Sequence, residues 1–132
     1  MFRKSRKKQH QIHTLIGPQT RIVGDIDFKG GLHVDGRVEG NIVASGGADS
    51  ILSVSESGFV EGSVDVPEVV MDGTVEGDVV VSGRVELGST ARVTGNVVYN
   101  LIEMAIGAEV NGKLIHQPPG PGSGEDRSQG DQ

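Results

Sequence analysis

The chain has 132 residues, enough for one domain and too few for two, and its 21 glycines accompany only one Tyr, three Phe and no Trp. It contains no cysteine, which excludes a disulfide framework and a thiolate metal site. The net charge of −6 at pH 7 is unevenly distributed, because residues 1–13 carry five Lys or Arg and no acid, whereas the remainder is acidic. No window approaches the roughly 18 apolar residues of a membrane-spanning helix, so we expect none.

Residues 1–13 form a basic segment that we expect to be a disordered tail. A secretory signal peptide would place an apolar run of about seven or more residues after the positive charges. This segment continues instead as QHQIH, so we do not expect export by that route. Its composition predicts contact with anionic lipid, since an aromatic ring can enter the headgroup region while basic side chains face the lipid charge. The alternatives are a solvated tail without a partner and, less favoured, contact with nucleic acid. The predicted membrane-binding residues are Phe2, Arg3, Lys4, Arg6, Lys7 and Lys8.

Residues 14–117 contain six copies of a pattern in which a glycine has an apolar residue two positions before it and another two positions after it. The copies are IVGDI, VEGNI, VEGSV, VEGDV, VTGNV and VNGKL, and their glycines are residues 24, 40, 62, 77, 95 and 112. Successive copies are 16, 22, 15, 18 and 17 residues apart, about 17.6 on average. The long interval contains ASGGADS (Ala44–Ser50), an insertion of small residues that we expect to form a loop.

This repeat predicts strands, because glycine inside a helix costs about 1 kcal/mol relative to alanine and because the apolar spacing is two. A period of about 17 to 18 residues matches one turn of a three-sided solenoid, whose inward side chains stack from turn to turn. We therefore predict an all-β fold, a right-handed parallel β-helix with a triangular cross-section and about six turns over residues 14–117. The alternative is an antiparallel sandwich or barrel with tight hairpins, for which a strand spacing of 8 to 12 residues would be expected.

The C-terminal segment, residues 118–132, reads PPGPGSGEDRSQGDQ and has no apolar side chain. Without apolar burial a segment cannot offset the entropy of ordering its backbone. We predict a disordered, acidic, Pro/Gly-rich tail. The predicted organisation is therefore a β-helical domain between two tails.

The two ends of such a coil present unpaired backbone groups and a bare apolar cross-section. Solenoids usually cover these ends with a helix or a polar repeat, and the sequence shows neither. We expect another copy of the chain to cover each end, which propagates as a filament. No phosphate loop of the form G-x-x-x-x-G-K-[ST] occurs, so we expect polymerisation without nucleotide and without a cofactor. The predicted polymer contacts are Leu15, Ile16 and Ile22 at one end and Met104, Ile106, Val110, Leu114 and Ile115 at the other.

An enzyme remains the alternative, because hexapeptide-repeat acyltransferases and related metal-dependent hydratases also use about 18 residues per turn. Sustained six-residue phasing is absent here, since intervals of 15 and 22 residues break it. His33 lies inside the predicted coil and His116 at its edge, whereas a zinc site needs about three such ligands. We assign no catalytic, cofactor-binding or metal-binding residue. A surface-exposed adhesive or ice-binding solenoid is a third class, for which flat threonine rows or an export signal would be expected.

Three features of the middle region occur together: TLIG (Thr14–Gly17), the recurring V-E-G and V-x-G-x-[IV] turns, and AEVNGKLIHQ (Ala108–Gln117). On these residues the middle region resembles the bactofilins, small bacterial cytoskeletal proteins with a central β-helical domain between short disordered tails. The resemblance implies nucleotide-independent, apolar filaments beneath the cytoplasmic membrane, where apolar means without directional polarity. Such a filament is a homopolymer with head-to-head and tail-to-tail contacts. The resemblance also implies a scaffold for cell-envelope proteins that act in cell shape and envelope building.

Overall fold

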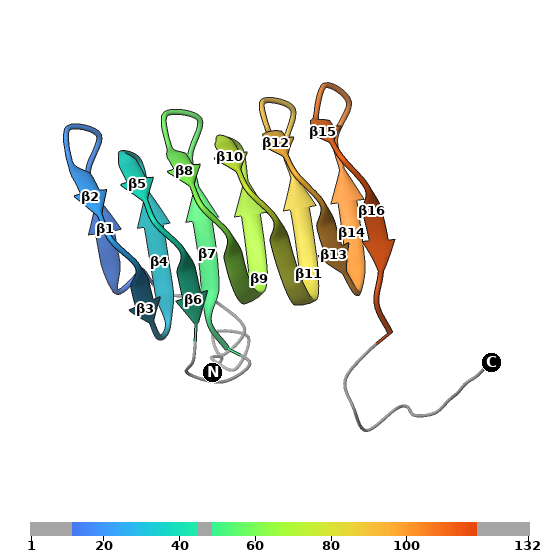
Figure 1. Ribbon diagram of the computed structural model, residues 1–132, viewed down its shortest axis with the longest axis horizontal. Coiled ribbons are helices and arrows are strands. Elements are labelled where there is room, and N and C mark those ends of the chain that lie inside the picture. The colour runs from blue at the N-terminus through green and yellow to red at the C-terminus, as the bar shows by residue number, and fades with distance from the viewer. Residues whose placement is uncertain (1–11, 45–48, 119–132) are drawn as a thin grey trace, which may run out of the picture.

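The computed structural model describes residues 12–44 and 49–118, and these residues form strands and turns without any helix. The strands are short and run parallel to one another in a continuous coil (Figure 1). In chain order they are β1 (Thr14–Ile16), β2 (Arg21–Val23), β3 (Ile26–Phe28), β4 (Gly31–Val34), β5 (Arg37–Glu39), β6 (Ile42–Ala44), β7 (Ile51–Val54), β8 (Phe59–Glu61), β9 (Val64–Met71), β10 (Thr74–Glu76), β11 (Val79–Leu87), β12 (Arg92–Thr94), β13 (Val97–Tyr99), β14 (Leu101–Met104), β15 (Glu109–Asn111) and β16 (Leu114–His116).

Each turn of the coil places one strand in each of three parallel ladders. Ladder A contains β1, β4, β7, the second part of β9, the second part of β11, and β14. Ladder B contains β2, β5, β8, β10, β12 and β15. Ladder C contains β3, β6, the first part of β9, the first part of β11, β13 and β16. The strands β9 and β11 serve two ladders because each continues through a corner.

The three ladders confirm the predicted all-β parallel solenoid of about six turns, and the antiparallel alternative is wrong. Every strand pair in the described residues is parallel, and each strand pairs with a strand about one repeat away in the sequence. The predicted insertion begins at Ala44, the last residue of β6, and ends just before β7, and the register across it is kept, with Val38 opposite Val60 in ladder B. Residues 45–48 of that insertion lie outside the described residues.

The core consists of stacks of inward side chains, one residue from each turn. In ladder B the stack runs through Val38, Val60, Val75 and Val93, all of them buried and in register. Because every second residue of a strand points inward, each strand contributes only one or two side chains to this narrow core in any one ladder. The near absence of aromatic residues follows, since a wide ring would separate turns that pair about 4.8 Å apart.

The repeated glycines form a column at the corner between ladders B and C. Gly77 has a φ of +152°, a conformation that side-chain-bearing residues rarely adopt, and a Cβ atom there would overlap the backbone carbonyl group of Gly62 in the preceding turn. Gly24 occupies the same place in turn 1, where a Cβ atom would meet nothing within 4 Å. The glycine requirement at Gly77 therefore arises partly from the neighbouring turn, and it weakens where the stack ends.

Candidate functional site at the two ends of the coil

Large exposed apolar side chains concentrate in the first and last turns. Among residues 12–44 and 49–118, turns 3 to 5 contain no strongly exposed large apolar residue, and turn 2 contains only Val43. Apolar surface of this kind marks interaction sites in soluble proteins. The exposed residues are Ile12, Leu15, Val23, Val43, Leu101, Met104, Ile106, Leu114 and Ile115.

At the C-terminal end, three of the predicted contact residues continue the buried stacks into the open cross-section. Met104 and Leu114 are 44% and 45% exposed, although the residues opposite them in turn 5 are buried. Val110 is partly buried in the same way, opposite Val93. Ile102 lies opposite buried Val85 and belongs to the same surface. These four side chains form an apolar end face, which we call the C-terminal end face.

At the N-terminal end the inward apolar side chains are less exposed than those at the C-terminal end. Ile16 is only 5% exposed and Phe28 is also buried, while Ile22 and Ile26 pack against the core and stay partly exposed. We call this set the N-terminal end face. Of the predicted N-terminal contacts, Ile22 is therefore available to a partner, whereas Ile16 supports the face from within.

Three of the predicted contact residues lie away from the end faces. Leu15 is 60% exposed on the outer side of ladder A, opposite His33, and Ile115 lies on the outer side of ladder C, opposite Val98. Ile106 is 98% exposed in the turn between β14 and β15. The sequence pattern grouped them with the ends because it identifies the turn in which a residue lies but not the side of the strand on which its side chain projects.

Three end-face residues, Ile26, Phe28 and Ile102, were missed by the sequence analysis. All three follow the two-residue alternation: Ile26 is the last apolar residue of IVGDI, Phe28 follows it by two positions, and Ile102 precedes Met104 by two positions. Alternation within each strand was therefore a usable signal for the inward face. Only the stacking register shows that these positions lie at an open end.

The corner between ladders B and C carries a column of polar side chains that joins successive turns. The carboxylate Oδ1 of Asp25 accepts a hydrogen bond from the backbone N–H of Asn41 at 2.9 Å, and Asn41 Oδ1 accepts one from Ser63 N–H at 2.9 Å. The same arrangement joins turns 4 to 6, where Asn96 Oδ1 accepts from the N–H of Lys113 at 3.0 Å. Lysine has no acceptor atom, so Lys113 ends this column at the C-terminal end.

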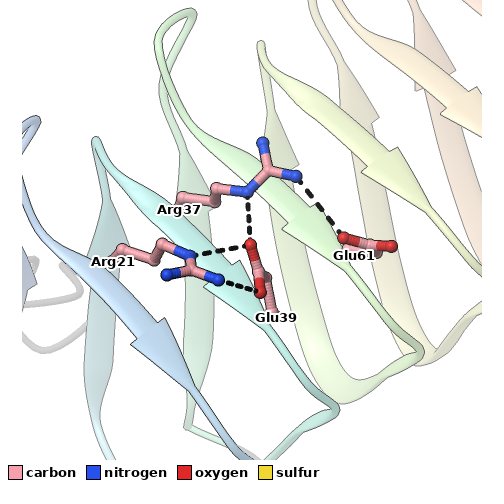
Figure 2. Close-up of polar contacts among 4 residues, drawn as sticks. All are labelled: Arg21, Arg37, Glu39 and Glu61. Atoms are coloured by element: carbon pink, nitrogen blue, oxygen red, sulfur yellow. Dashed lines mark hydrogen bonds and ion pairs between the residues drawn. The ribbon is translucent and has the colours of Figure 1, made fainter.

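An ion-pair network covers the outer side of ladder B over the first three turns (Figure 2). Arg21 donates two hydrogen bonds to the carboxylate of Glu39, each 2.9 Å long, and Arg37 Nε donates a third at 2.7 Å. Arg37 also reaches Glu61 at 3.4 Å and lies over the ring of Phe59. The hydrogen bonds from Arg21 and then Arg37 lower the pKa of Glu39 from its ordinary value of 4.5 to about 2. Glu39 therefore stays ionised at neutral pH, and the network links turn 1 to turns 2 and 3.

His33 belongs to β4, within the part of the sequence that forms the coil, and its side chain takes part in a polar cluster on the outer side of ladder A. Its Nε2 lies 2.9 Å from Asp35 Oδ1, and its Nδ1 lies 3.0 Å from Ser53 Oγ. A hydrogen bond from Ser55, together with His33, lowers the pKa of Asp35. Ser53, His33 and Asp35 stand in the order of the serine, histidine and carboxylate of a hydrolytic triad. Such a triad works with free N–H donors that stabilise an oxyanion, whereas the nearby Ser55 N–H already donates to Val34 O at 3.0 Å within the ladder. The contacts join turns 2 and 3, and they form on an outer strand surface.

Two further observations concern only the described part of the chain. No cluster of three or more His, Cys, Asp or Glu residues there could hold a metal ion. Nor does any helix in residues 12–44 or 49–118 have the length and apolar character needed to cross a membrane. All six predicted lipid-binding residues, from Phe2 to Lys8, and all but Pro118 of the predicted C-terminal tail lie outside the described residues.

At both ends of this parallel β-solenoid the core stacks end in partly or strongly exposed apolar side chains and unpaired strand edges, the kind of surface that self-association buries. The comparison with family models agrees with a self-associating protein. The chain belongs to the bactofilin family, described as polymer-forming cytoskeletal, whose model matches residues 14–115. Neither the curated proteins nor the solved structures gave a significant match. Family membership makes the chain a self-associating cytoskeletal scaffold with a structural role.

Proposed function

We propose that this chain polymerises without nucleotide into filaments that have no directional polarity. The filaments lie on the inner face of the cytoplasmic membrane, where they recruit envelope proteins that act in cell shape. The observation that carries the self-assembly step is that the inward positions, buried in turn 5, become partly or strongly exposed in turn 6, at Ile102, Met104, Val110 and Leu114. Burying two end faces against each other removes apolar surface from water and pairs the free edges of three strands at once.

We also propose that the contacts are head-to-head and tail-to-tail. An isologous contact needs only one self-complementary surface at each end, and strands related by a two-fold axis across the coil pair antiparallel. The polar corner column supports this arrangement. Within the column, the backbone N–H of one turn donates to the side-chain oxygen of the turn before it. In a head-to-tail contact the N–H of Asp25 in one copy would face the side chain of Lys113 in the next copy, and Lys113 has no acceptor atom for it.

The basic tail supports attachment to lipid. Each Lys or Arg near an anionic membrane contributes up to about 1 kcal/mol, so one tail binds weakly. A filament presents many tails along one line, and multivalency then makes the attachment stable.

Self-assembly is tested by electron microscopy of the purified chain with no nucleotide present. We expect filaments one coil wide, and addition of ATP or GTP should leave their amount in a high-speed pellet unchanged. A stable monomer or a closed trimer would contradict the proposed function.

Membrane attachment is tested by deleting Met1–Lys8. We expect the truncated chain to form filaments normally and to lose at least about tenfold in co-sedimentation with phosphatidylglycerol vesicles, because all five basic residues of the tail are removed. Phosphatidylcholine vesicles serve as the uncharged control. Undiminished binding of the truncated filaments to phosphatidylglycerol would remove the lipid proposal.

A further inference from the structure

The outer side of ladder C carries a row of apolar side chains over the last three turns. Val80, Val98 and Ile115 lie in register one above another, and each projects away from the core because its neighbours Val79, Val97 and Leu114 form the inward stack. Val80 and Val98 are partly exposed and Ile115 is exposed. We call these three residues the C-ladder strip. The end-on-end contacts do not account for it, since an outward side chain in turn 4 or 5 lies beyond their reach.

The polar groups beside the strip are already engaged within the chain. On the side of ladder B, Asp78 Oδ1 accepts from Asn96 N–H at 3.0 Å and Asn96 Oδ1 accepts from Lys113 N–H at 3.0 Å. On the side of ladder A, Asn100 Nδ2 donates to Gln117 O at 3.3 Å. These groups already have hydrogen-bond partners within the chain. A second surface that covers the strip would therefore remove few hydrogen bonds between them and water.

The same ladder changes character along its length. In turns 1 and 3 the outward positions in register with the strip are Asp27 and Asp65, separated by Val43. Ladder C thus has an acidic outer surface toward the N-terminal end and an apolar one toward the C-terminal end. Two copies that bring their apolar halves together keep their acidic halves apart, which avoids opposing like charges.

We propose that the C-ladder strip is the lateral contact through which one filament of this chain packs against another. This inference rests on the proposed filament, because a tail-to-tail contact brings the strips of two copies to the same joint. The strip itself consists of three side chains, two of them only partly exposed, and is far smaller than the surface of about 800 Å² per partner in a stable complex. Isolated copies therefore do not pair through it, whereas a filament repeats it many times and gains from multivalency.

The test replaces Val98 by lysine and uses Thr94→Lys as the matched control. Both positions lie in turn 5 and project outward, but Thr94 belongs to ladder B. Low-speed centrifugation collects bundles and high-speed centrifugation collects all filaments, at low and at high salt. Screening of the acidic coils should increase bundling of the wild type with salt. We expect Val98→Lys to reduce the low-speed pellet at least fivefold at high salt and to leave the high-speed pellet unchanged, while Thr94→Lys behaves as the wild type.

Val98→Thr, which keeps the shape and the preference for strands, provides a variant that should stay folded and reduce bundling to a smaller extent. Wild-type filaments that never bundle, or Val98→Lys filaments that bundle normally, would overturn the lateral contact and leave the proposed filament intact. A wild type without filaments would overturn the proposed function itself. If Val98→Thr instead lowered binding to phosphatidylglycerol vesicles with bundling unchanged, the strip would be a lipid contact and the inference would be wrong.

Discussion

Replacing Leu114 by lysine is expected to abolish long filaments while the coil stays folded. In the free chain the new ammonium group lies at the open C-terminal end face, where Leu114 is 45% exposed and water can solvate it. In a filament the same group must enter an apolar contact without a partner of opposite charge, which costs several kcal/mol. Circular dichroism should report an unchanged coil, and high-speed sedimentation should lose the polymer.

The product that remains distinguishes the two possible polarities. If filaments are head-to-head and tail-to-tail, blocking the C-terminal end face leaves the N-terminal contact intact, so we expect dimers in analytical ultracentrifugation. Ile22→Lys should likewise leave dimers joined at the C-terminal end faces, and the double variant should be monomeric. Monomers from Leu114→Lys alone would indicate head-to-tail contacts.

Thr94→Lys is again the control, because it adds the same charge on the outer surface one turn earlier. It should form filaments like the wild type. Filaments that persist in Leu114→Lys would show that the C-terminal end face is not a polymer contact.

Replacing Gly77 by alanine is expected to destabilise the coil by about 2–6 kcal/mol. The backbone at Gly77 has a φ of +152°, and the added Cβ atom would lie 2.6 Å from the carbonyl carbon of Gly62. Conformational strain and overpacking each cost about 1–3 kcal/mol. The obstructing atoms are backbone atoms held in a ladder, so they cannot move aside as a flexible side chain would. Thermal unfolding followed by circular dichroism should show a large fall in Tm.

Gly24→Ala separates the two costs. Gly24 also has a left-handed φ, +133°, but its Cβ atom would meet nothing within 4 Å. We expect Gly24→Ala to carry the conformational cost alone and to lower Tm clearly less than Gly77→Ala. Equal losses would show that contact between turns contributes nothing to the glycine column.

The fold could be predicted because the same physical constraint recurs in every turn. A glycine column, an apolar residue two positions on either side of it and a period near 17.6 residues are local features, and stacking repeats them in register. The turn containing Met104, Val110 and Leu114 was predicted to be an open end for the same reason.

The side of the strand on which a residue projects was harder to predict. Ile115 is adjacent to Leu114 in the sequence, and both are apolar, but one lies opposite outward Val98 and the other opposite buried Val97. The ion pair between Arg21 and Glu39 joins residues 18 positions apart, and it depends on a register that only the coil creates. Both features depend on which residues the winding places side by side.

The number of turns has a consequence for the spacing of attachments along a filament. Six turns at about 4.8 Å each make a coil roughly 29 Å long, and this length is set by the number of repeats in the chain. In a head-to-head and tail-to-tail filament the N-termini come in pairs, one pair every two coils, or about 58 Å. The solenoid would therefore act as a molecular ruler, and a chain with one repeat more or fewer would place its paired basic tails about 10 Å farther apart or closer together.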